Sequence, residues 1–214
     1  MIRTTLLVSI LIVAIALSST NAFAAEAVIF SEELPPGALL DELRADSLFT
    51  ITSENPYAGS NHLKRDIALG GWGWITGISS MNLDLTDIDF DKAFVEFYID
   101  SGAIAIGYME LRIAGPGWEP DNGTEITVDD APGYERISVM LKDFNGSQLG
   151  RNPANMDEFT GGTGKIDTWS VGFGAEGDLL VDEIRISDGE SSLVSAEVSA
   201  EHKLAVTWGK LKSS

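Results

Sequence analysis

The stretch Phe94-Val-Glu-Phe-Tyr-Ile-Asp100 predicts the fold of this chain. Its side chains alternate in character, so an extended strand places Val95, Phe97 and Ile99 on one face. The opposite face then carries Glu96, Tyr98 and Asp100. A period of two is typical of a strand that packs one face on a hydrophobic core and turns the other outward.

The same alternation recurs on both sides of this stretch. Residues 108–113 group Met109, Leu111 and Ile113, and residues 134–141 group Ile137, Val139 and Leu141. Further candidate strands, separated by turns rich in Gly, Asn and Pro, are 48–52, 62–69, 72–78, 125–129, 168–173 and 179–186. Nine or ten short strands predict an all-β protein, an antiparallel β-sandwich or jelly roll. We expect one short helical turn at 39–44 and a long surface loop over 145–165.

The first 25 residues are typical of a secretory signal peptide. Arg3 provides the charge, residues 6–17 are almost all hydrophobic, and Ala22-Phe23-Ala24 matches the small-x-small pattern of signal peptidase sites. The hydrophobic run is too short to span a membrane. We therefore expect a secreted chain, periplasmic or extracellular, that begins at Ala25 or Glu26. The domain is expected over 26–187, followed by a linker and a basic tail over 188–214.

Composition excludes several classes of function. The chain has no cysteine and two histidines, so a zinc site of the cysteine type is impossible and a thiol nucleophile is absent. A net charge of −19 repels nucleic acid and anionic membranes, and it favours neutral partners and calcium. Phosphate-binding and dinucleotide fingerprints are absent. Paired acids of a glycoside hydrolase remain an alternative, but nothing singles out one pair, so we predict no enzyme and no catalytic residue.

Four segments occur in an order that resembles the galactose-binding-like jelly-roll family of carbohydrate-binding modules. They are Gly59-Ser-Asn-His-Leu63, Leu83-Asp-Leu-Thr-Asp-Ile-Asp-Phe-Asp91, Tyr134-Glu-Arg-Ile-Ser-Val139 and Gly177-Asp-Leu-Leu-Val-Asp-Glu-Ile-Arg-Ile186. The resemblance implies a jelly roll and a polysaccharide or glycan as the partner. It also implies a structural calcium ion held by Asp182 together with Glu32 or Glu33. The chain departs from the family pattern at Tyr134 and Glu183.

The outward faces of the central strands supply the candidate ligand-binding residues. Aromatic rings stack on the C–H faces of sugars, while carboxylates and guanidinium groups bind hydroxyls. If the strands are neighbours, their outward side chains form one patch. We add Trp118, from the turn-rich loop 115–120, and Trp74, which shares a face with Trp72 at period two. The alternative for this pair is a place in the core. The predicted residues are Tyr98, Tyr108, Glu110, Arg112, Arg136, Trp118 and Trp74. The alternative is an ordinary polar outer face.

These observations predict a secreted, non-catalytic carbohydrate-binding module. The alternative is an extracellular structural or protein-interaction β-sandwich that binds no sugar. A shallow aromatic surface on one sheet would favour the first, and a flat face whose tyrosines are covered by loops would favour the second.

Overall fold

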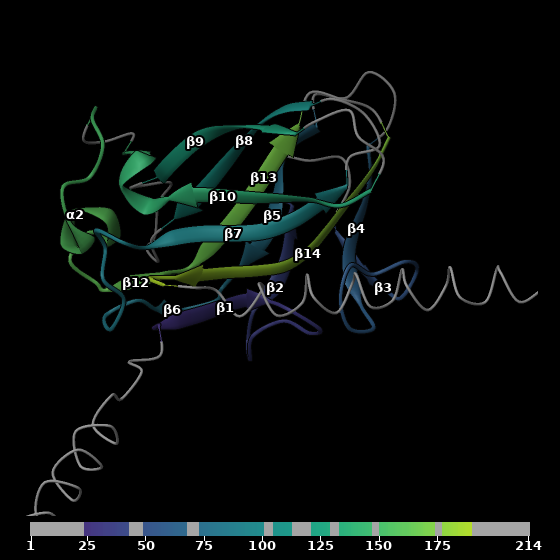
Figure 1. Cartoon of the computed structure of the whole chain (residues 1–214), viewed down its shortest axis with the longest axis horizontal. Coiled ribbons are helices and arrows are strands. Elements are labelled where there is room, and N and C mark those ends of the chain that lie inside the picture. The colour runs from purple at the N-terminus through teal and green to yellow at the C-terminus, as the bar shows by residue number, and fades with distance from the viewer. Residues whose placement is uncertain are drawn as a thin grey trace, which may run out of the picture.

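A computed structural model shows two β-sheets packed face to face (Figure 1). It describes residues 24–42, 49–67, 73–100, 105–112, 121–128, 133–146, 150–173 and 177–189. The predicted signal peptide and basic tail lie almost wholly outside these residues and stay predictions. No helix among the described residues is long and hydrophobic enough to cross a membrane.

The first sheet forms the front layer of Figure 1. Its central strand is β14 (Gly177–Ser187), which pairs with β7 (Phe94–Asp100) on one side. On the other side β14 pairs with β4 (His62–Ile67) near its start and with β1 (Glu26–Phe30) near its end. The sheet is completed by β10 (Glu135–Met140) beside β7 and β3 (Thr50–Thr52) beside β4. All of these pairings are antiparallel.

The second sheet lies behind the first and is also antiparallel. Its strand order is β11 (Asn145–Gly146), β9 (Asp121–Val128), β8 (Ala105–Arg112), β13 (Thr168–Phe173), β5 (Gly73–Ser79) and β2 (Leu39–Glu42). A separate pair of short strands joins β6 (Leu83–Asp84) to β12 (Lys165–Ile166). The predicted helical turn at 39–44 is wrong, because its first four residues form the edge strand β2 on the ladder of β5.

The segment 145–165 is more ordered than the loop predicted for it. It contains the short helix α2 (Met156–Thr160) as well as β11 and the start of β12; the 3-10 turn η1 (Leu141–Asp143) precedes it. The Asn155 side chain caps α2 by accepting a hydrogen bond from the Glu158 nitrogen. Gly161 ends the helix at φ 60°, a left-handed conformation that glycine adopts without steric cost. A period of two does not reveal such short elements, because the sequence marks the helix only by its capping residues.

The core between the sheets contains most of the residues that the alternation predicted; Val139 is partly buried, and Ile113 lies outside the described residues. Val95, Phe97 and Ile99 of β7 are fully buried, as are Met109 and Leu111 of β8. Trp169 of β13 is also fully buried, and its ring lies against the rings of Phe97 and Phe49. The predicted all-β sandwich and the buried face of its central strands are confirmed.

A bulge in β14 changes which side chains face outward. The register against β7 shifts between Asp182 and Arg185, and Glu183 adopts φ 52°. The flanking residues Val181 and Ile184 are both in the core. One extra residue in the strand therefore places two consecutive carboxylates, Asp182 and Glu183, on the outer side of the sheet.

Candidate functional site

The structure divides the predicted sugar-binding patch between two opposite faces. Tyr98 of β7 and Arg136 of β10 are cross-strand partners in the first sheet. Tyr108, Glu110 and Arg112 lie on β8, which belongs to the second sheet. The expectation that these strands are neighbours is wrong for β8, so the residues do not form one patch. The side chains of Trp74 and Trp118 lie outside the described residues.

Tyr98 points away from the core, as predicted, but it is only 3% exposed. The ring of Tyr57, from the loop after β3, stacks on it with a centroid distance of 3.6 Å and an interplanar angle of 15°. Tyr134 meets Tyr57 edge-on at 5.6 Å, and its own edge-on neighbour is the buried His62 at 6.5 Å. The prediction that Tyr98 is an open stacking surface is therefore wrong.

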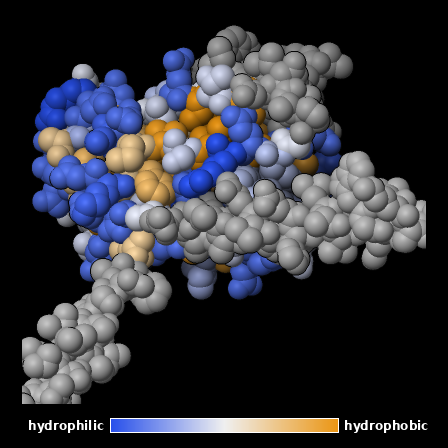
Figure 2. Space-filling view, in the orientation of Figure 1, coloured by the Kyte–Doolittle hydropathy of each residue, from blue (hydrophilic) through white to orange (hydrophobic). Residues whose placement is uncertain are grey.

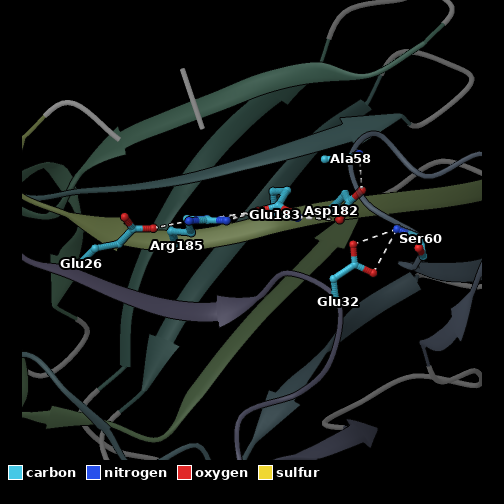
Figure 3. Close-up of polar contacts among 7 residues, drawn as sticks. All are labelled: Glu26, Glu32, Ala58, Ser60, Asp182, Glu183 and Arg185. Carbon is cyan, nitrogen blue, oxygen red and sulfur yellow. Dashed lines mark hydrogen bonds and ion pairs between the residues drawn. The ribbon is translucent and has the colours of Figure 1, made fainter. Parts of the chain in front are cut away.

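Ion pairs occupy another part of this outer face. Arg136 pairs with Glu96, which is buried, and Arg185 contacts both Glu183 and Glu26. Figure 3 shows the chain of contacts from Glu26 through Arg185 to Glu183 along β14. In the space-filling view of this side, hydrophilic residues surround a central hydrophobic area (Figure 2). Most of the charged side chains named here form ion pairs with one another.

Tyr108 is different, because it is exposed on the outer face of the second sheet, which is true of no other aromatic side chain that the structure describes there. It is 39% exposed, and its two strand neighbours, Met109 and Gly107, are buried. A Cβ atom added to Gly123 on β9 would lie 2.1 Å from the Tyr108 hydroxyl oxygen. The ring therefore lies across Gly123, where any larger residue would collide with it. This glycine lets the tyrosine lie along the sheet.

Polar groups follow Tyr108 along β8. Glu110 and Arg112 form an ion pair in which the Arg112 Nε donates to the Glu110 Oε2 at 3.0 Å. Glu110 is opposite Ser170 of β13, which in turn is opposite Gly77 of β5. The Ser170 hydroxyl is buried and has no hydrogen-bond partner among the described residues. Glu110 and Arg112 are 9% and 7% exposed, so this face combines an exposed aromatic ring with a buried ion pair, a buried unsatisfied hydroxyl and small residues.

This arrangement suits a polyhydroxylated ligand. An exposed ring supplies a surface for the hydrophobic face of a pyranose. A carboxylate accepts, and a guanidinium donates, hydrogen bonds to sugar hydroxyls, and the ion pair holds both groups in one geometry. The sequence predicted Tyr108, Glu110 and Arg112, which the structure places together on β8, but it gave no signal for Gly123 and Ser170, which strand register brings beside them.

A second feature concerns the loop that carries Tyr57. The buried carboxylate of Asp182 accepts hydrogen bonds from the backbone nitrogens of Ala58, at 3.1 Å, and Glu183, at 2.9 Å. Glu32 accepts from the nitrogens of Ser60, at 2.8 Å, and Asn61, at 3.1 Å (Figure 3). Two carboxylates from distant parts of the chain therefore fasten this loop over Tyr98.

Burial raises the pKa of Asp182 to about 7. Hydrogen bonds from the nitrogens of Ala58, Glu183 and Tyr57 oppose this rise, because they stabilise the ionised form. Burial also raises the pKa of Tyr134, with further contributions from Asp182 and Asp100. The face of the first sheet near Tyr98 is therefore a poor environment for additional negative charge.

The described residues do not fit the predicted calcium ion. Calcium takes six to eight oxygen ligands with lone pairs directed at the ion. Here backbone N–H groups face the carboxylates of Asp182 and Glu32, and Glu33 is an exposed side chain. In the described part of the chain, no group of three or more acidic or histidine side chains is arranged so that it could hold a metal ion. The two carboxylates already hold the loop and leave the ion no evident ligands. Calcium binding itself is untested and stays a prediction.

A melting experiment decides this question. Because backbone N–H groups already satisfy both carboxylates, we expect the same melting temperature in millimolar calcium and in excess chelator. A ligand that binds only the native state raises the melting temperature. A rise with calcium that is lost in Asp182→Ala would instead establish the ion and contradict the fit described above.

No protein-family model and no curated protein sequence matches this chain. Solved structures do. A family 30 carbohydrate-binding module of a cellulosomal cellulase from Clostridium thermocellum superposes with a TM-score of 0.53 at 14% identity, covering 78% of this chain and 99% of that one. A further family 30 module gives a TM-score of 0.52 at 14% identity, with 78% and 90% coverage. This chain has the jelly-roll fold of carbohydrate-binding modules. A family 11 module from the same organism, 20% identical, covers 78% and 96% with a TM-score of 0.47.

The likeness confirms the predicted fold class and its resemblance to jelly-roll binding modules. It covers almost the whole length of the two family 30 modules, so the fold is that of a complete module. Identities this low concern the fold, and the ligand has to be argued from the side chains of this chain.

Proposed function

We propose that this protein is an extracellular, non-catalytic carbohydrate-binding module that binds a neutral polysaccharide on the outer face of its second sheet. The observation that carries the proposal is the exposed Tyr108 ring lying across Gly123. The fold supports it, because the family 30 modules that share the fold are named as carbohydrate-binding. The predicted signal peptide supports a location outside the cytoplasm.

The register of the second sheet suggests how the polysaccharide lies. Gly123, Glu110, Ser170 and Gly77 are consecutive cross-strand neighbours on β9, β8, β13 and β5. Strands are about 4.8 Å apart, so this row is roughly 14 Å long. A chain lying along the row would place about three sugars across the strands, with one of them against Tyr108. A row crossing the sheet from strand to strand suits the interior of a linear polysaccharide.

Charge favours a neutral ligand over an acidic one. The chain carries a net charge of −19, and Glu125 lies directly across from Tyr108. Glu110 is paired with Arg112, which fixes the carboxylate as a hydrogen-bond acceptor. Glycosidases use two carboxyl groups in two different roles, and here the Glu110 carboxylate is already engaged by Arg112. We therefore propose binding without hydrolysis, to be checked by measuring release of reducing sugar.

Affinity electrophoresis tests the proposal. Gels containing a mixed-linkage β-glucan, a xylan, a galactomannan or the acidic polygalacturonate should show retardation by at least one neutral polymer. Tyr108→Ala should weaken that binding about five- to tenfold, because one stacking contact is lost. The unfolding free energy should change by no more than roughly 0.5 kcal/mol, as is usual for exposed positions.

Ile51→Ala is the matched control, since Ile51 is 41% exposed on β3 of the first sheet. Its affinity should equal that of the unmodified protein. Retardation by none of the four polymers would favour the interaction-domain alternative. Binding that survives Tyr108→Ala unchanged would remove the second-sheet face from the account.

A further inference from the structure

The two ends of the described domain meet at Asp188, directly after β14. One carboxylate oxygen of Asp188 accepts a hydrogen bond from the Ala25 backbone nitrogen at 2.8 Å, and the other accepts from the Asp89 nitrogen at 2.8 Å. The Asp188 nitrogen donates to the Ala25 carbonyl oxygen at 3.2 Å. The start of β1 and the end of β14 lie side by side there (Figure 1), with Glu26 opposite Ser187.

Ala25 belongs to the folded domain. It is half-buried and packs against the hydrophobic core, although it lies one residue outside the boundary expected from the sequence. Its nitrogen and its carbonyl oxygen are both bound to Asp188. A cut after Ala25 would remove both hydrogen bonds, whereas a cut before it would keep them.

Asp188 is a carboxylate that a neighbouring cation would stabilise. In the part of the chain that the structure describes, no Lys or Arg side chain forms a salt bridge with it; the nearby Lys92 contacts Asp89 instead. Arg185 is engaged by Glu26 and Glu183. The atoms placed against the Asp188 carboxylate are the backbone nitrogens of Ala25 and Asp89, and cleavage before Ala25 gives the first of them a charge.

We infer that export processing cuts the chain between Ala24 and Ala25, and that the new α-ammonium group of Ala25 forms an ion pair with the carboxylate of Asp188. The cut follows the small-x-small sequence Ala22-Phe23-Ala24. Hydrolysis of that peptide bond converts a neutral amide nitrogen into a cation with three donors, at a nitrogen already 2.8 Å from its acceptor. A charge-assisted hydrogen bond is stronger than the neutral one it replaces. Processing therefore strengthens the closure of the domain.

The first experiment determines the mature N-terminus. The full-length chain is expressed in a host with a Sec export pathway, and the exported protein is analysed by intact mass and N-terminal sequencing. We expect a chain that begins at Ala25. A chain that begins at Glu26, or at any other residue, would overturn the inference.

The second experiment is a double-mutant cycle on chains ending at Ser214. Two chains begin at Ala25 and two begin at Ala24, which leaves the Ala25 nitrogen as an amide. In each pair, one chain keeps Asp188 and the other carries Asp188→Asn. The loss of the Asp89 hydrogen bond is common to both pairs and cancels. Asp188→Asn should lower the melting temperature about 2–4 °C more in the chains that begin at Ala25.

An equal effect of Asp188→Asn in both pairs would overturn the ion pair. If the variant does not fold, the unmutated chains decide by themselves. The chain that begins at Ala25 should then melt above the chain that begins at Ala24, and equal or inverted melting temperatures would overturn the inference.

Discussion

Replacing Tyr98 with alanine should lower the free energy of unfolding by about 3 kcal/mol. The Tyr98 ring is 3% exposed and stacks on Tyr57 at 3.6 Å, so its removal leaves a cavity beneath the loop. Removing a large aromatic residue from a buried position costs about 3–5 kcal/mol, and the outer location of this ring places it near the lower end. Urea unfolding at constant pH measures the change.

Tyr108→Ala is the control, because it removes the same side chain from an exposed position. A cycle with Tyr57→Ala should show a coupling of about 0.5–1.5 kcal/mol between Tyr57 and Tyr98, the usual value for stacked rings. A Tyr98→Ala variant within 0.5 kcal/mol of the unmodified protein would show that the loop does not cover this ring in solution.

Asp182→Asn should change how stability depends on pH. The pKa of Asp182 is raised from 3.8 to about 7 in the folded protein. Between these values the native state binds more protons than the unfolded state, so the contribution of Asp182 to stability falls as pH rises. From pH 5 to pH 8 this loss amounts to about 2–3 kcal/mol, at 1.36 kcal/mol per pKa unit. Asp182→Asn should remove this pH-dependent loss of stability, because asparagine does not titrate.

The comparison with the variant is essential, because His62 contributes in the opposite direction. Burial lowers the pKa of His62, so its contribution to stability is lost as pH falls below its ordinary value of 6.5. The difference between the two proteins, measured by urea unfolding at pH 5, 6, 7 and 8 in chelator, isolates Asp182. A pH-independent difference would mean that the three N–H donors outweigh burial and keep this carboxylate ionised.

Sequence periodicity predicted the fold well because core burial imposes a period of two on long strands. It placed Phe97, Met109 and Leu111 in the core and located most strands within a few residues. It failed where packing on a neighbour determines structure, as in β2, an edge strand of four residues that forms on the ladder of β5. Short elements carry too few residues for a period to be recognised.

The site was predicted only in part, because alternation gives the direction of a side chain but neither its neighbours nor its cover. Tyr98 and Tyr108 are equivalent by alternation, yet they lie on opposite faces of the sandwich. Tyr57 covers one of them from a loop that has no periodic pattern, following Asn55-Pro56. Strand order in a jelly roll depends on long connections. The alternation within one strand does not indicate which strand pairs with it.

The most direct test of the account is to find which sheet meets the sugar. The 15N-labelled protein is titrated with an oligosaccharide cut from the neutral polysaccharide that it binds, and amide chemical shifts are followed by NMR. The account predicts that the largest changes occur at Tyr108, Gly123 and Ser170 on the second sheet. The amides of Tyr57, Tyr98 and Tyr134 on the first sheet should stay nearly unchanged. Changes centred on those three tyrosines, with Tyr108 unaffected, would contradict it.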